Sequence, residues 1–397
     1  MLYIRGHKVI KGYIGNTPVS HVGFGKSGLI KIKSENGGSD YPNNLMAKYT
    51  TNTSGVLPVF NSGYQYTINE TESNGVYTVE LFSDTDFTSC SFNGKTQLLT
   101  VEYLKVTDKV TNMKYMFKDC NKLTLLDVSN FNTSNVTNMN GMFRDCTKLK
   151  TIIGLNNFDV SKVTYMNMMF HNLPLITSLD LSSWNTDSLV YTTNDNENGG
   201  MFSYCSKLQS ITFGEGWNTS QVTNMKYMFK DCNKLTSLDL SNFNTSNVTD
   251  MQYMFEDCNN LTSLDVSNFN TSNVTNMQYM FEDCNNLTSL DVSNFNTSNV
   301  TNMTQMINEC YDLTELNISN WYLNSEVDVT DIFQDTNVLT NVIMNNSDYN
   351  SVNKIIKVLP TRTSEAGCLD VTGVDDISLI DEETLNSKNW VLSNVGH

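Results

Sequence analysis

The sequence predicts an α/β solenoid, a stack of about nine coils in which each coil contributes one short strand and one short helix or 3₁₀ segment. The first observation is a 26-residue unit, Asp257–Glu282, whose first 21 residues recur letter for letter in Asp283–Met303. The second is that its apolar residues fall first at strand spacing and then at helical spacing. One such unit is too small to bury a core alone, so neighbouring units must stack on one another.

The strand of each unit is predicted from two apolar residues that flank a polar one, as Leu264 and Val266 flank Asp265. This alternation is typical of a strand with one buried face. An aromatic residue follows, and then Asn-Thr-Ser-Asn, a composition typical of turns and helix caps. The same apolar pair recurs at Leu126/Val128, Leu179/Leu181, Leu238/Leu240, Leu290/Val292 and Leu316/Ile318.

The second half of each unit carries apolar residues at spacings of 3, 3 and 1, as at Val248, Met251, Met254 and Phe255. This spacing predicts a short helix or 3₁₀ segment with one face inward, and it places the methionines in the core. Neighbouring strands are farther apart than the ~3.8 Å that joins the Cβ atoms of a disulfide, so a cysteine column is expected to hold buried thiols. The column is Cys120, Cys146, Cys205, Cys232, Cys258, Cys284 and Cys310.

The residues beside the buried pair should point outward, and they form a column of serine and aspartate. Two interpretations remain open. Each aspartate could accept hydrogen bonds that order its own coil. Alternatively, the stripe is a concave polar surface for a glycan or protein, helped by a cation such as Ca²⁺, although the sequence contains no complete calcium loop. The candidate residues are Asp127, Asp180, Ser237, Asp239, Ser241, Ser263, Asp265, Ser267, Ser289, Asp291 and Ser293.

Four regions are predicted along the chain. Residues 1–38 are a β anchor segment, in which Tyr3-Ile4 and Tyr13-Ile14 begin two similar units ten residues apart. Residues 39–104 follow a linker at 35–44 and form a small β domain that caps the solenoid. Residues 105–344 are the solenoid, and residues 345–397 are a C-terminal cap. The strands expected in the β domain are Val56–Phe60, Tyr64–Ile68, Val76–Phe82 and Leu98–Leu104.

Two details at and beyond the repeats are also predicted. The polar run Tyr191–Gly200 lengthens one unit and should form a loop, either on a binding face or as a tolerated insertion. In the cap, Ser351–Leu359 is expected to be a helix that Pro360 ends, and Trp390–Leu392 the closing strand.

Several function classes are excluded. A net charge of −17, from 42 acidic and 25 basic residues, disfavours a nucleic-acid surface. No signal peptide or membrane-spanning segment is recognisable. The four histidines are scattered, and His171 is expected to face solvent. No catalytic constellation, metal motif or phosphate loop is found, so the chain is expected to be no enzyme and to use no cofactor.

Two resemblances give these observations a context. Leu261–Cys284, LTSLDVSNFNTSNVTNMQYMFEDC, resembles the BspA-like bacterial leucine-rich-repeat family over residues 105–344. That resemblance implies a right-handed leucine-rich-repeat solenoid and a surface-exposed binding protein or adhesin. The N-terminal pattern YIGNTPVSHVGFG resembles segments of head and tail fibre proteins of phages, including crAss-like phages. An ordinary β cap is the alternative for this segment.

The expected function is that of a non-enzymatic virion structural and binding protein, a phage head or tail fibre or decoration protein. Tyr3, Ile4, Tyr13 and Ile14 would anchor it to other virion proteins. The solenoid would engage a host-surface protein or glycan, and the chain is expected to form a homo-oligomer without binding nucleic acid or membrane. The alternative is a bacterial cell-surface adhesin of the BspA-like type.

Overall fold

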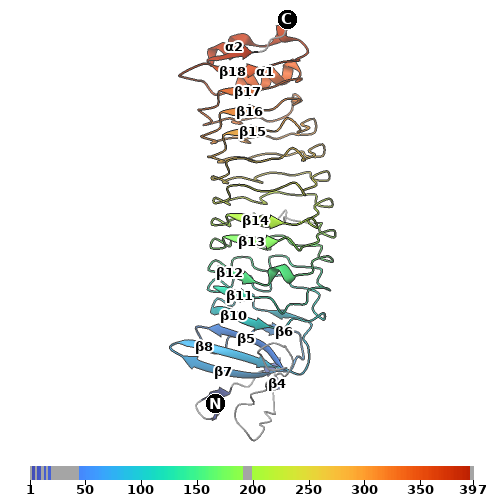
Figure 1. The fold of residues 1–397 in the computed structure, drawn as a ribbon, viewed down its shortest axis with the longest axis vertical. Coiled ribbons are helices and arrows are strands. Elements are labelled where there is room, and N and C mark those ends of the chain that lie inside the picture. The colour runs from blue at the N-terminus through green and yellow to red at the C-terminus, as the bar shows by residue number, and fades with distance from the viewer. Residues whose placement is uncertain are drawn as a thin grey trace. The chain divides into compact units, whose positions relative to one another are not determined.

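The structure, a computed structural model, describes residues 2–4, 7–9, 13–14, 17–18, 44–190 and 199–393. The chain divides into two compact units, Met1–Val160 (unit 1) and Ser161–His397 (unit 2). Together they hold a β-solenoid of about 11 turns, with few helices (Figure 1). The solenoid prediction is confirmed, whereas the expected number of about nine coils is too low.

Unit 1 is organised around one mixed sheet with the strand order β1-β2-β7-β8-β5-β10-β11-β12. Its first six strands pair antiparallel, and β10, β11 and β12 pair parallel. Two small antiparallel pairs, β3-β4 and β6-β9, accompany it. The bounds are β1 (Leu2–Ile4), β2 (His7–Val9), β3 (Tyr13–Ile14), β4 (Thr17–Pro18), β5 (Leu45–Thr51), β6 (Val59–Phe60), β7 (Thr67–Ser73), β8 (Val76–Phe82), β9 (Cys90–Ser91), β10 (Leu98–Leu104), β11 (Leu125–Asp127) and β12 (Thr151–Ile153).

Strand β10 joins the antiparallel sheet to the coils of unit 1. It pairs antiparallel with β5 on one side and parallel with β11 on the other. Strands β8 and β10 have the bounds that the sequence predicts. Strand β5 was not predicted from the sequence. This central strand is buried at most positions, so it lacks the polar–apolar alternation of a strand with one solvent-exposed face.

Unit 2 repeats the parallel part of this architecture. Strands β13 and β14 form one pair, and β15 to β19 form a five-stranded parallel sheet in chain order. The last two strands, β18 and β19, belong to the predicted C-terminal cap. The cap therefore continues the stack, and its strands account for some of the coils beyond the nine that the sequence predicts. The bounds are β13 (Ser178–Leu181), β14 (Ser210–Phe213), β15 (Ser289–Asp291), β16 (Glu315–Asn317), β17 (Asn341–Ile343), β18 (Gly367–Asp370) and β19 (Trp390–Ser393).

The helical elements are few and short. Helix α1 (Tyr349–Val358) begins after Asp348, whose side chain accepts a hydrogen bond from the Ser351 N–H, and it ends just before Pro360, as predicted. Helix α2 (Glu382–Ser387) precedes β19, where Trp390 is fully buried. The described residues also contain two 3₁₀ turns, η1 (Leu155–Asn157) in unit 1 and η2 (Ile377–Leu379) in unit 2.

The helix or 3₁₀ segment expected in the second half of each repeat is absent from the coil around Met251–Asp257, and this expectation is wrong. The N–H groups of Met251, Tyr253 and Phe255 donate to carbonyls of the next coil at 2.9 to 3.0 Å instead of to their own. Tyr253 and Asp257 have φ of 59°, in the left-handed region that interrupts a right-handed helix. Each coil is therefore a chain of turns bonded to its neighbours, which makes the fold a β-solenoid.

The interior of the coils is made of repeated columns. Phe170, Phe202, Phe229, Phe255 and Phe281 stack with ring centroids 5.5 to 5.7 Å apart. The methionine columns are buried, as predicted. The cysteines are free, and each thiol of the seven-member column donates to the carbonyl of a phenylalanine one coil earlier, at 3.0 to 3.4 Å. The prediction of buried thiols is confirmed.

Candidate binding surfaces

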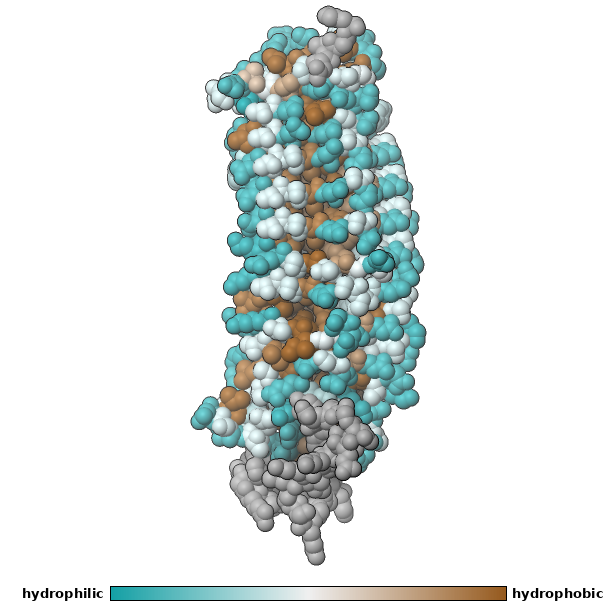
Figure 2. Space-filling model, viewed as in Figure 1, coloured by the Kyte–Doolittle hydropathy of each residue, from teal (hydrophilic) through white to brown (hydrophobic). Residues whose placement is uncertain are grey.

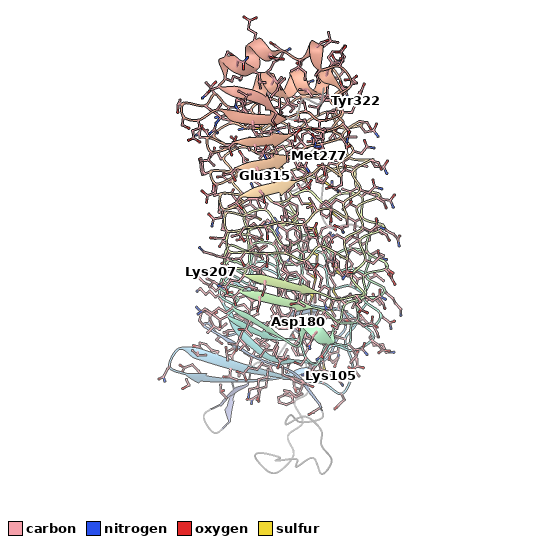
Figure 3. The ribbon with its side chains drawn as sticks, turned by 45° about the horizontal axis from the view of Figure 1, so that its top comes forward. Lys105, Asp180, Lys207, Met277, Glu315 and Tyr322 are labelled. Atoms are coloured by element: carbon pink, nitrogen blue, oxygen red, sulfur yellow. The ribbon has the colours of Figure 1, made fainter. Side chains whose placement is uncertain are left out.

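The predicted serine and aspartate columns lie beside the buried apolar residues of the coils, on strands β11, β13 and β15 and in the segments 237–241 and 263–267, where the expected strand does not form. We call the eleven candidate residues named in the sequence analysis the serine–aspartate face. In β13, Leu179 and Leu181 are buried, whereas Ser178 and Asp180 are exposed. The parallel register sets equivalent residues of neighbouring coils opposite each other, as Ser289 and Glu315. Figure 3 shows Asp180 and Glu315 on strands of this face.

Every aspartate of this face closes a local turn. Its Oδ1 accepts the N–H of the residue two positions on, at 2.9 to 3.1 Å, in each of five coils. Asn317 accepts the Ser319 N–H in the same way, so the role needs a side-chain oxygen and no charge. The geometry favours the first interpretation, in which the aspartates order their own coils.

These hydrogen bonds also keep the face negatively charged. The Ser182 side chain and N–H both hold the pKa of Asp180 below its ordinary value, since they stabilise the carboxylate. Ser267 lowers the pKa of Asp265 in the same way. Asp127 is half-buried, but the side chains of Asp180, Asp239, Asp265 and Asp291 are exposed, so these four remain available to a partner at neutral pH.

Replacing Asp239, Asp265 and Asp291 together by asparagine should leave the melting temperature at pH 7 nearly unchanged and make the protein less sensitive to acid. Their folded-state pKa values are lowered, so their stabilising contribution is present above the unfolded value of about 3.9 and is lost as the pH falls through the folded values. Thermal melts between pH 7 and pH 2 measure this. A large loss at pH 7 would show that the charge itself holds the coils.

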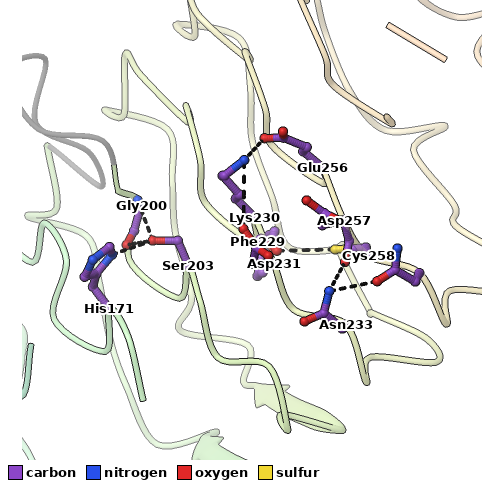
Figure 4. Close-up of polar contacts among 11 residues, drawn as sticks. His171, Gly200, Ser203, Phe229, Lys230, Asp231, Asn233, Glu256, Asp257 and Cys258 are labelled. Atoms are coloured by element: carbon purple, nitrogen blue, oxygen red, sulfur yellow. Dashed lines mark hydrogen bonds and ion pairs between the residues drawn. The ribbon is translucent and has the colours of Figure 1, made fainter. Parts of the chain in front are cut away.

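A second polar surface lies on the turn half of the coils, and the sequence analysis did not single it out. In Figure 4 Lys230 lies between Asp231 of its own coil and Glu256 of the next. Burial raises the pKa of Glu256 to about 7, although Lys230 opposes this shift. Beside these residues Tyr227, Tyr253 and Tyr279 stack at 4.8 Å between ring centroids.

His171 is another residue that the sequence misplaced. It is 8% exposed, and its Nδ1 lies 2.7 Å from the Ser203 Oγ. Ser203 in turn donates to the Gly200 carbonyl and accepts its N–H (Figure 4). The expected solvent-facing position is wrong because Gly199 lies against the ring: a Cβ at residue 199 would be 2.5 Å from the His171 Nδ1. The predicted loop Tyr191–Gly200 otherwise lies outside the described residues, apart from these two glycines.

The C-terminal part of unit 2 contains a cleft of about 860 Å³ beside helix α1. Tyr322, which is 55% exposed, lines it together with Lys354 and Lys357. The Lys354 ammonium donates to the carbonyls of Asn324 and Ser325, so it is already engaged within the cleft wall.

Figure 2 shows mostly polar side chains on the visible face of the unit 2 coils, with apolar atoms in a narrow seam.

The predicted anchor residues lie in the N-terminal strands. Tyr3 and Ile4 belong to β1, and Tyr13 and Ile14 belong to β3. Strand β2 joins β1 to the main sheet of unit 1 through the pair Lys8 and Glu70. Among the described residues, no helix is both long and apolar enough to cross a membrane.

Comparison with models of protein families gives a match in three segments of the chain. The family model described as "Mycoplasma protein of unknown function, DUF285" matches residues 89–199, 192–264 and 261–365. No curated protein matches the chain. The three tandem matches run through the coils of both units, which is the result that an uninterrupted series of similar repeats gives.

Proposed function

We propose a function for this chain from its family and its surface. The chain belongs to the DUF285 family of Mycoplasma proteins of unknown function. We infer that it is a non-enzymatic recognition protein. Its coils present a regular polar surface to a partner outside the cell or particle that carries it. The partner is a host-surface protein or glycan. This function needs no catalytic group, and a stack of coils supplies an extended rigid surface for it.

The observation that carries the proposal is the preorganisation of the serine–aspartate face. Equivalent side chains recur one coil apart, and each aspartate is already fixed by a hydrogen bond from its own coil. Side chains that are ordered before binding lose little conformational entropy when a partner arrives. A repeated row of carboxylates and hydroxyls suits a ligand that itself repeats donors, such as the hydroxyl groups of a glycan or a basic protein surface.

Arginine at Ser263 and Ser289 should abolish partner binding while leaving the coils folded. Both positions are exposed and lie one coil apart on the face, so large cationic side chains there block it and reverse its charge. Glycan arrays and a panel of host-surface proteins, probed with the full chain, measure binding. The matched control is arginine at Ser246 and Ser272, one coil apart on the turn that follows the phenylalanine column. Equal binding by all three proteins would contradict the proposal.

The context proposed first is a virion, in which the chain is a phage head or tail fibre or decoration protein. The support is the resemblance of the N-terminal segment to such fibres, and the short paired strands β1-β2 and β3-β4 found there. Tyr3, Ile4, Tyr13 and Ile14 are the proposed anchor to other virion proteins, in a homo-oligomer. The second candidate is a bacterial surface adhesin of the BspA-like leucine-rich-repeat type, which the match to a family of bacterial proteins favours.

Deleting residues 1–38 should abolish incorporation into particles and leave the coils folded. Strands β5, β7, β8 and β10 pair with one another, and the pair that this sheet loses among the described residues is its edge contact with β2. Quantifying the protein in purified particles tests incorporation, and circular dichroism with a thermal melt tests folding. Undiminished incorporation of the shortened chain would contradict the anchor, and a full-length chain found on a bacterial envelope would favour the adhesin.

A further inference from the structure

The cleft beside helix α1 lies where the repeat pattern breaks. In the preceding coil Phe295 is followed by Asn-Thr-Ser-Asn-Val at 296–300. After Trp321 the corresponding segment is Tyr-Leu-Asn-Ser-Glu-Val at 322–327, which is one residue longer. The asparagine and threonine that begin the pattern are thereby replaced by Tyr322 and Leu323. This coil therefore lacks the threonine hydroxyl that joins other coils to their neighbours.

The loss of this hydroxyl changes how the coil meets the chain that follows it. One coil earlier, the Thr297 hydroxyl accepts the Tyr322 N–H at 2.9 Å and donates to the Tyr322 carbonyl. Leu323 has no hydroxyl, and its own N–H donates at 2.7 Å to the Oγ of Ser351, which is fully buried in α1. Helix α1 therefore packs here in place of a regular turn. Residues of both segments line the cleft of about 860 Å³, a size typical of small-molecule sites.

Two lysines of α1 line this cleft. Lys354 and Lys357 are three positions apart, so they share one side of the helix. The Lys354 ammonium uses two of its three N–H donors on the carbonyls of residues 324 and 325, which leaves one donor. Within residues 199–393 the ion pairs are those of Lys230, so the exposed Lys357 keeps its charge unpaired. The cleft therefore offers positive charge and N–H donors to an anion.

The acidic groups near these lysines do not cancel this charge. Asp348 also lines the cleft, but its carboxylate accepts hydrogen bonds from both the N–H and the hydroxyl of Ser351. Burial lowers the pKa of Lys354, and Asp328 and Glu326, which act in the opposite direction, do not outweigh the burial. An incoming anion would therefore supply counter-charge that the Lys354 ammonium lacks.

The rest of the lining suits a ligand with a ring and hydroxyl groups. Tyr322, labelled in Figure 3, is 55% exposed, so much of its ring is available to a ligand in the cleft. An exposed aromatic ring can cover the C–H face of a sugar ring. Asn350 is exposed in the same cleft, and its amide can both donate and accept hydrogen bonds. The cleft therefore combines an aromatic ring, an amide and two ammonium groups.

We propose that this cleft binds a sugar that carries a carboxylate, such as a glucuronic acid unit. Lys357 and the remaining N–H of Lys354 bind the carboxylate through charge-assisted hydrogen bonds. Tyr322 packs against the C–H face of the pyranose ring, and Asn350 bonds one of its hydroxyls. A neutral sugar would leave the ammonium groups without counter-charge, and a simple carboxylate would leave the Tyr322 ring uncovered. The cleft shares no residue with the serine–aspartate face, so this inference does not depend on the binding proposed for that face.

Isothermal titration calorimetry of the full chain with methyl glucuronide tests the cleft. Methyl glucoside is the matched neutral sugar, and N-acetylglutamate amide is the matched carboxylate, as an acidic peptide would present it. We expect saturable binding of methyl glucuronide that weakens as the salt concentration rises, and at least about 5-fold weaker binding of the two matched compounds. The absence of saturable methyl glucuronide binding would overturn the proposal. Equally tight binding of either matched compound would overturn the assignment of an acidic sugar.

Two variants test whether the ligand lies in the cleft. Lys357→Gln and Tyr322→Ala each replace an exposed side chain, so the coils should stay folded, which a thermal melt checks. Each should weaken methyl glucuronide binding by about 5-fold or more. Lys207→Gln, at an exposed lysine of unit 2 outside the cleft, is the matched control and should bind as the parent does. Parent-like binding by both cleft variants would contradict the site, and so would an equal loss in the Lys207→Gln protein.

This test is separate from the test of the proposed function. The protein with arginine at Ser263 and Ser289 should bind methyl glucuronide as the parent does, because both positions lie outside the cleft. Loss of partner binding with retained sugar binding therefore concerns the serine–aspartate face alone. If this protein lost methyl glucuronide binding as well, the sugar would lie on that face, and the assignment to the cleft would be wrong.

Discussion

Replacing Phe255 by alanine should lower the free energy of unfolding by about 3–5 kcal/mol, as expected for truncating a fully buried aromatic side chain. Phe255 is 0% exposed, and its ring lies 5.6 Å from those of both Phe229 and Phe281. Removing it leaves a cavity between two coils, which neither neighbour can fill because each is held by its own backbone hydrogen bonds to the next coil.

Denaturant unfolding followed by circular dichroism measures this loss. Phe255→Leu is the control, because it keeps most of the buried volume and should cost clearly less than alanine does. A loss of only a few tenths of 1 kcal/mol for Phe255→Ala would show that this column does not hold the coils together.

The second large effect is expected at Gly214, which occupies the position that Ser182 and Ser241 hold in neighbouring coils. Because other repeats have serine at this position, the repeat pattern alone predicts that Gly214→Ser is harmless or stabilising. A Cβ at residue 214, however, would lie 1.8 Å from the Ser182 carbonyl oxygen, which belongs to the backbone. Gly214→Ser should therefore destabilise the protein by about 1–3 kcal/mol or more, because two coils must move apart.

Thermal and denaturant unfolding of Gly214→Ser test this expectation. Asn317→Asp is the control, since it also moves a residue toward the commonest one in its column, but adds no bulk. It should change the free energy of unfolding by less than about 0.5 kcal/mol. If the Gly214→Ser protein proved as stable as the parent, the two coils could not approach each other as closely at residue 214 as the structure places them.

The strand half of several coils could be predicted from the sequence, because a short buried pair such as Leu290 and Val292 has one simple interpretation. In the coils at 236–240 and 262–266 the expected strand does not form, and Leu264 is only half-buried. The turn half could not be predicted. Apolar residues at spacings of 3, 3 and 1 fit a helix and fit a chain of turns equally well. The residues that distinguish them, Tyr253 and Asp257, adopt left-handed φ without being glycine. Tertiary hydrogen bonds to the next coil impose that conformation, and no local signal announces it.

The polar surfaces were predicted only in part. The outward direction of the serine–aspartate face follows from strand alternation, and the structure shows it. The charged surface on the turn half was missed because Lys230 and Glu256 look like ordinary surface charges in a chain with 42 acidic and 25 basic residues. A signal existed, since Glu256 stands where Lys118 and Lys230 stand in other coils. His171 was misplaced because its burial depends on glycines that follow it by about one coil.

The cysteine column has a consequence for the redox conditions that the folded chain tolerates. Oxidation and disulfide exchange require a thiolate. Burial raises the pKa of Cys205 and Cys310 to about 12 and raises those of Cys232, Cys258 and Cys284 as well. Each of these thiols is also held by a phenylalanine carbonyl. In the folded coils these five thiols therefore resist oxidation and disulfide exchange, whether the surroundings are reducing or oxidising.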